Sequence, residues 1–289
     1  MMHGYFLGVS MKNFLFFSVL FGVVSFAFAQ DSKDLWSGSD YNKNSEEQRA
    51  AARQTLDTLA LAGYEKVLDI GCGDGYLTSL IVNQVPEGSV TGIDLSPSMI
   101  SFASEQFKKN SLSFRVLDAR SLDYENQFDL VVSFTTLHWI PEQLVVLQGI
   151  ERSLKSSGKM IVDIPSALPK QMIQAVEETM AKKEWAPFFY QFSPGWRFFT
   201  ADEYQELLDE SGLQASKILQ VEVPHLFPTR SAFIGFLKQW FPYLRPLPEA
   251  KKGAFLEQVV HRYLELFSPD KEGRPRFVVN RLRIEATKL

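Results

Sequence analysis

The sequence contains few of the residues that build disulfide frameworks and metal centres. Its 289 residues include a single cysteine, Cys72, which excludes an intrachain disulfide and a multi-cysteine zinc site. Its four histidines, His3, His138, His225 and His261, show no spacing typical of metal ligands. We therefore expect no metal in this protein.

An excess of basic residues is also missing. Lysine and arginine total 30 against 34 aspartate and glutamate, a formal net charge of −4, so there is no basic footprint for nucleic acid. The composition is 45% hydrophobic and 22% charged, as in globular proteins with a sizeable core. At roughly 150 residues per domain, the length suggests about two domains.

Long apolar runs are equally scarce, with one exception near the N-terminus. Residues 14–29, FLFFSVLFGVVSFAFA, carry no charge, follow Lys12 and end in an A-x-A pattern, as secretory signals do. A membrane anchor is the alternative, although a helix of this length spans only about 24 Å of a ~30 Å bilayer core. We therefore expect residues 1–29 to be a signal-like or anchor segment that engages a membrane or the export machinery. A cytoplasmic location is the alternative.

Short apolar runs alternate with helical patterns over the next part of the chain. The expected strands are 66–70, 89–94, 113–117, 128–134 and 159–164, and the expected helices are 76–85, 97–109 and 142–154, the last closed by residues 155–158. Strands buried on both faces and separated by helices predict an α/β fold with a doubly wound, mostly parallel sheet. We expect this core to span residues 30–165.

The pattern changes after residue 165. Helices are expected at 170–183 and 200–211, the second capped by Thr200 with Glu203 at its third position, and strands are expected at 216–223 and 277–288. The last strand alternates cleanly and is expected to be antiparallel. Segment 185–199 holds eight aromatic residues, and segment 224–269 holds two helical stretches. We interpret residues 166–289 as a helical, aromatic-rich cap plus the last strands of the sheet, while ordinary core packing is the alternative for the aromatics.

Residues 69–75, DIGCGDG, follow the first strand and open a helix. Glycine allows positive φ and close approach of a ligand, and the N–H groups of a helix N-terminus favour negative character. A dinucleotide loop, G-x-G-x-x-G, is the alternative. Its sixth position is the bulky Tyr76, however, and Asp69 would repel a pyrophosphate. Asp69 suits an ammonium group instead.

DIGCGDG resembles the first motif of class I S-adenosylmethionine-dependent methyltransferases. The resemblance implies a seven-stranded, Rossmann-like sheet and S-adenosylmethionine as cofactor. It also implies that three strand ends carry acids facing the cofactor, which agrees with the rule that open α/β sheets bind ligands at this edge. The implied cofactor-binding residues are Asp69, Gly71, Cys72, Gly73 and Gly75 for the methionine end, Asp94, Leu95 and Met99 near the ribose, Asp118 and Ala119 for the adenine, and Ser133 beneath.

Two further segments resemble one branch of this family. Residues 36–48, with Trp36, Tyr41 and Gln48, and the stretch T-L-H-W-I-P-E are similar to trans-aconitate and malonyl-carrier-protein methyltransferases. The L-H-W part is also similar to insect juvenile hormone acid methyltransferases, and all three groups methylate carboxylates. The resemblance implies that Tyr41 and Gln48 fold over the cofactor. The alternative is that the aromatic residues of this segment simply pack against the helix expected at residues 45–61.

The L-H-W stretch places His138 and Trp139 where the methyl acceptor should lie. A carboxylate is already ionised at pH 7 and needs no general base, so His138 would position the substrate. A hydroxyl or amine acceptor would instead make His138 a base. Arg197, Arg230 and Arg245 are candidate cations for an acidic substrate.

We therefore expect methyl transfer to a carboxylate oxygen of a small molecule, with no nucleic-acid partner. Transfer to carbon, nitrogen or a hydroxyl oxygen is the first alternative. The second is a non-catalytic cofactor-binding protein.

Overall fold

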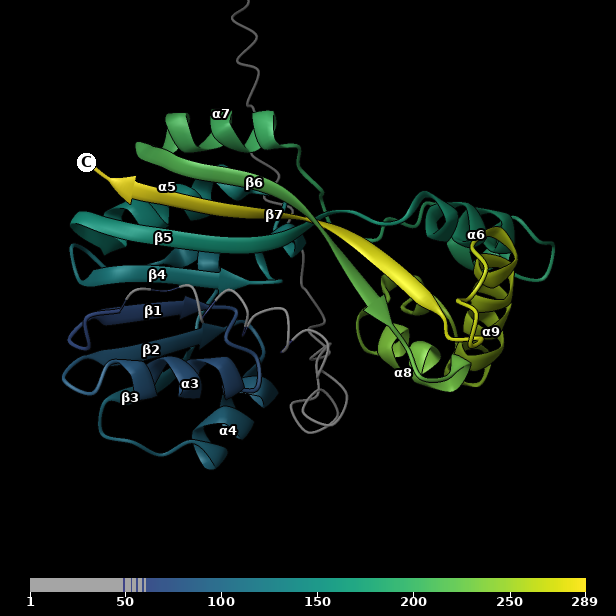
Figure 1. Cartoon of the computed structure of the whole chain (residues 1–289), viewed down its shortest axis with the longest axis horizontal. Coiled ribbons are helices and arrows are strands. Elements are labelled where there is room, and N and C mark those ends of the chain that lie inside the picture. Colours follow the sequence, from purple (N-terminus) through teal and green to yellow (C-terminus); the bar gives the residue numbers. More distant parts are fainter. Residues whose placement is uncertain (1–48, 50–52, 54–55, 57–58, 60) are drawn as a thin grey trace, which may run out of the picture. The chain divides into compact units, whose positions relative to one another are not determined.

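Seven strands form one mixed sheet in the computed structural model, which describes residues 49, 53, 56, 59 and 61–289 (Figure 1). The order is β3-β2-β1-β4-β5-β7-β6, and β7 alone runs antiparallel to its neighbours, as the sequence predicts. The strands are β1 (Lys66–Ile70), β2 (Ser89–Asp94), β3 (Leu112–Val116), β4 (Phe128–Phe134), β5 (Leu154–Ala167), β6 (Leu213–Leu226) and β7 (Arg276–Lys288).

The helices of the described part lie between these strands. They are α3 (Tyr76–Gln84), α4 (Pro97–Gln106), α5 (Gln143–Ser153), α6 (Lys170–Met180), α7 (Ala201–Ser211), α8 (Arg230–Trp240) and α9 (Glu249–Leu266). All described residues belong to one compact unit, residues 34–289.

Helices cover both faces of the sheet, because alternate residues of each central strand join different cores. In β1, Val67 packs with Ile81 and Val82 of α3. Its neighbour Leu68 packs on the opposite side with residues of α5 and α7. The doubly wound α/β architecture predicted from the buried apolar runs is therefore present.

β6 and β7 are longer than the sequence pattern predicts. They pair from Leu213 opposite Lys288 to Leu226 opposite Arg276, so their far ends extend beyond the other strands into the helices of the cap (Figure 1). The expected strand 216–223 is short at both ends because β6 is an edge strand, whose exposed polar residues hide the alternation.

The cap has an aromatic core of its own. α6, α8, α9 and the segment before α7 enclose buried Phe233, Phe255 and Tyr263, and Phe277 of β7 packs among them. Trp185 also lies in this core. The helical, aromatic-rich cap predicted for this half of the chain is confirmed, and many of its aromatics are ordinary core residues.

The expected start of β5 is also wrong. Residues 155–158 were expected to close a helix, but they lie within β5. Phe128 pairs with Leu154 and Leu130 pairs with Lys159, so the intervening residues form an irregularity in the strand. Ser157 takes a positive φ of 63° there, which accommodates the extra length.

No helix within the described ranges is long and apolar enough to cross a membrane. The predicted signal-like or anchor segment, residues 1–29, lies outside the described residues. The expected boundary between core and cap, after residue 165, falls near the end of β5.

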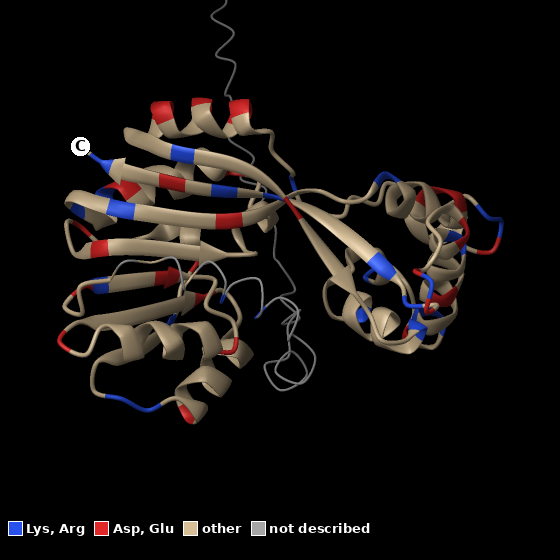
Figure 2. Ribbon diagram, in the orientation of Figure 1, with Lys and Arg blue, Asp and Glu red and all other residues tan. Residues whose placement is uncertain are grey.

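α7 closes one face of the sheet and begins with the capping box that the sequence predicts. Thr200 accepts a hydrogen bond from the Glu203 backbone N–H at 3.2 Å, and the Glu203 carboxylate accepts one from the Thr200 N–H at 2.8 Å. Acidic residues recur along α7 (Figure 2), while Tyr204 and Leu208 are fully buried. The capping box at Thr200 therefore stabilises the start of a helix that covers β6.

The Thr200→Ala substitution tests this anchor. We expect it to lower the free energy of unfolding by about 1 kcal/mol, because the Glu203 backbone N–H loses its hydrogen-bond partner. Thr200→Ser keeps the hydroxyl and is the matched control. Equal melting temperatures for the alanine variant and the unmodified chain would contradict the assignment.

Candidate functional site

Three acidic residues lie where neighbouring parallel strands end at one edge of the sheet. Asp69 is near the end of β1, Asp94 ends β2, and Asp118 follows β3 by two residues. The register places β2 between β1 and β3, so these positions are adjacent in space. The structure therefore brings the three predicted acids to one edge.

The three glycines of the loop after β1 differ in the space around them. Gly71 has φ of +74°, and a Cβ there would lie 2.2 Å from the side chain of Thr136. A Cβ on Gly75 would lie 2.7 Å from Ala103 and 2.8 Å from Phe114. Gly73, with φ of +54°, would meet no protein atom within 4 Å. The backbone at Gly73 is thus left open to a ligand, while Gly71 and Gly75 serve packing.

Asp94 connects this loop to β2. Its carboxylate accepts the Gly73 N–H at 3.0 Å and the Ser96 N–H at 2.9 Å. Leu95 follows with a side chain that is 59% exposed, and Met99 is buried beneath. A carboxylate beside an exposed apolar side chain suits a ligand that carries both hydroxyl groups and a flat apolar ring.

Asp69 is almost fully buried, and burial raises its carboxyl pKa to about 7. The Thr78 hydroxyl, which sequence analysis missed, donates a 2.7 Å hydrogen bond to it and lowers the pKa, while the charge of Asp94 raises it. Such a carboxylate gains from a nearby cation, because the cation compensates for its lost hydration.

Asp118 already has a cationic partner in this structure. Arg120 donates to its carboxylate from the side chain at 2.7 Å and from the backbone N–H at 2.9 Å, which lowers the pKa of Asp118. Sequence analysis missed Arg120. Ala119 is buried behind this turn.

Ser133 and Cys72 face the protein interior. The Ser133 hydroxyl donates to the Ile70 carbonyl at 2.9 Å and is fully buried, so it joins the ends of β4 and β1. Cys72 is buried, and a Cβ on Gly92 would lie 3.0 Å from its Sγ. The side chains of both predicted cofactor-binding residues are thus buried within the protein.

The predicted residues Tyr41 and Gln48 lie outside the described residues. The neighbouring Arg49 forms an ion pair with buried Asp74 of the glycine loop, and its guanidinium lies 4.3 Å from the Tyr76 ring. Arg53 donates to the Tyr76 hydroxyl at 2.8 Å. Sequence analysis missed these contacts, although the bulky Tyr76 in the loop was a signal for them.

His138 and Trp139 form a short 3₁₀ turn (Leu137–Trp139) after β4. His138 is buried, its Nδ1 has no hydrogen-bond partner among the residues that the structure describes, and burial together with the Arg281 charge lowers its pKa to about 3. It is thus neutral and a weak base at pH 7. The Arg197 N–H donates to the His138 carbonyl at 2.8 Å, which connects the turn to the aromatic segment.

The three candidate arginines have different surroundings. Arg230 pairs with Glu257 on α9 at 2.9 Å, and Arg197 pairs with Glu203 at 3.7 Å. Arg245 lies 5.1 Å from the centre of the Trp139 ring and donates to the Pro194 carbonyl at 3.4 Å. Within the described part of the chain, Arg245 has no carboxylate within 4 Å, and burial lowers its pKa.

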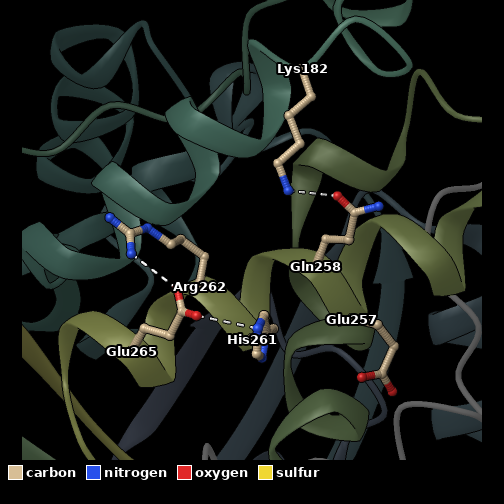
Figure 3. Close-up of a pocket in the computed structure, with 6 residues that line it drawn as sticks. All are labelled: Lys182, Glu257, Gln258, His261, Arg262 and Glu265. Carbon is tan, nitrogen blue, oxygen red and sulfur yellow. Dashed lines mark hydrogen bonds and ion pairs between the residues drawn. The ribbon is translucent and has the colours of Figure 1, made fainter.

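An open groove of about 430 Å³ lies elsewhere, on α9 beside the end of α6 (Figure 3). Its cations already have partners: Arg262 pairs with Glu178 and Glu265, and Lys182 donates to Gln258. The groove shares no residue with the strand ends. We therefore place the functional site at the strand ends and the turn after β4.

The sequence of the core matches a family model described as a methyltransferase domain, over residues 63–212, more than half of the chain. The chain is 28% identical over 210 residues to a malonyl-[acyl-carrier protein] O-methyltransferase of Priestia megaterium, covering 69% of this chain and 75% of the relative. It is 25% identical over 242 residues to a trans-aconitate 2-methyltransferase of Methylobacterium nodulans, covering 83% and 93%.

Solved structures show the same fold. The YcgJ protein of Bacillus subtilis matches with a TM-score of 0.57 at 17% identity, covering 83% of this chain and 98% of that one. A phosphoethanolamine N-methyltransferase of Haemonchus contortus, solved with S-adenosylhomocysteine, matches with a TM-score of 0.55 at 16% identity, covering 90% and 58%. The chain therefore belongs to the methyltransferase domain family and is an S-adenosylmethionine-dependent methyltransferase.

Proposed function

We propose that this methyltransferase esterifies a carboxylate of a small-molecule acid. The observation that carries the proposal is Arg245, an exposed cation over the Trp139 ring with no carboxylate within 4 Å among the described residues. A guanidinium with no carboxylate nearby favours an anionic ligand, and its planar fork matches a carboxylate. The similarity to malonyl-carrier-protein and trans-aconitate methyltransferases supports an acidic acceptor.

The cofactor-binding residues fit S-adenosylmethionine. Gly73 leaves room at the backbone, the Asp94 carboxylate is a suitable acceptor for ribose hydroxyls, and exposed Leu95 offers an apolar contact for the adenine. Asp69 compensates the positive charge of the methionine end. When bound, the cofactor supplies a sulfonium methyl group, which forms a C–O bond with the acceptor as the C–S bond breaks and its electron pair returns to sulfur.

The chain's own contribution is to place and dehydrate the acceptor. A carboxylate is ionised at pH 7 and requires no proton removal, which agrees with a neutral, weakly basic His138. An alcohol or ammonium acceptor would require a base, and the low pKa of His138 makes it unsuitable for that role. Catalysis then depends on positioning and on exclusion of water.

A radiolabelled methyl assay on the full chain tests the proposed acceptor class. We expect label from S-adenosylmethionine to enter carboxylic acids in a panel that pairs each acid with its alcohol and amine analogues. The product is expected to release volatile methanol in mild alkali, as methyl esters do. Label found only in alkali-stable products of the amines or alcohols would contradict the proposal.

Substitution of Arg245 tests its role with the acid that is turned over. Arg245→Gln is expected to raise the KM for that acid by about tenfold or more, because a charge-assisted hydrogen bond is lost. The affinity for S-adenosylmethionine, measured by calorimetry, should stay within about twofold. Arg230→Gln, which removes an arginine already paired with Glu257, is the matched control. Equal KM values for both variants would contradict the assignment.

The raised pKa of Asp69 predicts a pH dependence of cofactor affinity. Asp69 is mostly neutral below pH 7 and mostly ionised above it, and only the ionised form attracts the positive methionine end. We therefore expect the Kd for S-adenosylmethionine to fall roughly eightfold between about pH 6 and pH 7.5.

Two controls separate this effect from general pH sensitivity. The Asp69→Asn variant should lose the dependence, and adenosine, which lacks the charged methionine end, should bind the unmodified chain equally at both pH values. A pH dependence that persists in Asp69→Asn would contradict the role of Asp69.

A further inference from the structure

The turn that carries His138 and Trp139 begins with a strained residue. Thr135 directly follows β4 and has a φ of 55°, in the left-handed region. This conformation is uncommon for residues other than glycine and is unfavourable for a β-branched side chain. Such strain persists only where the surrounding structure holds the backbone in place.

Arg281 of β7 and Asp163 of β5 supply the holding contacts. The Thr135 N–H donates to the Asp163 carbonyl at 2.8 Å, and Arg281 Nη2 donates to the Thr135 hydroxyl at 2.7 Å. The same Nη2 donates to the Asp163 carbonyl at 3.1 Å, while Arg281 Nε pairs with the Asp163 carboxylate. The side chains of Arg281 and Asp163 are only 8% and 2% exposed, so water competes little for these bonds.

The conformation of Thr135 determines where the next residues lie. Thr136 turns toward β1, packs on Gly71 and donates to its carbonyl at 3.3 Å. The Trp139 N–H then donates to the Thr136 carbonyl at 3.0 Å, which closes the 3₁₀ turn. The conformation of Thr135 thus determines how the turn that carries His138 and Trp139 lies relative to the glycine loop.

We propose that Arg281 is a positioning residue for methyl transfer. Anchored on Asp163, its guanidinium holds Thr135 in the left-handed conformation and so places His138 and Trp139 beside the glycine loop. A guanidinium suits this task because it donates at once to the carboxylate, the carbonyl and the hydroxyl. The single ammonium of lysine cannot reproduce this planar set of bonds.

Arg283 provides a matched control within the same strand. It donates to the Asp163 carboxylate at 3.0 Å, and within the described part of the chain it makes no hydrogen bond to Thr135. Arg281→Lys and Arg283→Lys therefore each alter one bond to the same carboxylate and keep the charge. Only the first alters the contact with Thr135.

The experiment is ¹⁹F NMR of the full chain labelled with 5-fluorotryptophan. The chain has five tryptophans, and the Trp139→Phe variant assigns the Trp139 resonance. We expect Arg281→Lys to shift or broaden the Trp139 resonance and Arg283→Lys to leave it in place. Thr135→Val keeps the Arg281–Asp163 pair and removes the hydroxyl, so it should shift the resonance without impairing folding. An unchanged Trp139 resonance in Thr135→Val would overturn the proposal.

Rescue by glycine separates positioning from stability. Glycine adopts positive φ without strain, so Thr135→Gly added to Arg281→Lys should return the Trp139 resonance to its original position, while the melting temperature stays lowered. With any acceptor that is turned over, kcat/KM should fall about tenfold in Arg281→Lys and recover in the double variant.

A double variant whose Trp139 resonance stays displaced would overturn the proposal. The NMR comparison needs no methyl acceptor, so its result is independent of whether the acceptor is a carboxylate.

Discussion

The close contact of two turns, one after β1 and one after β4, is the constraint on which the site depends. Gly71 and Thr136 approach so closely that a single added methyl at Gly71 would overlap the threonine side chain. β1 and β4 are neighbours in the sheet, so both turns leave the same edge side by side. The glycine loop and the turn at Leu137–Trp139 therefore pack as one unit, and we expect displacement of either one to move the other.

Electrostatics at this edge follow from burial as much as from charge. Asp69 and Asp94 lie close enough that the charge of Asp94 raises the pKa of Asp69, in addition to the effect of burial. Asp94 is held by backbone N–H groups. Asp74, in the same loop, pairs with Arg49. Cations thus contact two acids of this edge, Arg49 at Asp74 and Arg120 at Asp118.

The cap is joined to the core by the same strands that complete the sheet. β7 pairs with β5 inside the core, while its N-terminal half carries Phe277 into the aromatic core of the cap. Arg281 lies between these two parts. One strand therefore contributes to the sheet, to the contact with Thr135 and to the cap. We expect this shared strand to couple the position of the cap to that of the turn at Leu137–Trp139.

Local patterns in the sequence are sufficient for much of this protein. The glycine loop, the acids at successive strand ends, the capping box at Thr200 and the alternating last strand all depend on residues close together in the chain, so spacing alone reveals them. The tertiary structure alone distinguishes Arg245, which contacts Trp139, from Arg230, which pairs with Glu257. It alone joins Arg281 to Thr135, 146 residues away. Such contacts depend on the path of the chain between the elements, and no local pattern records that path.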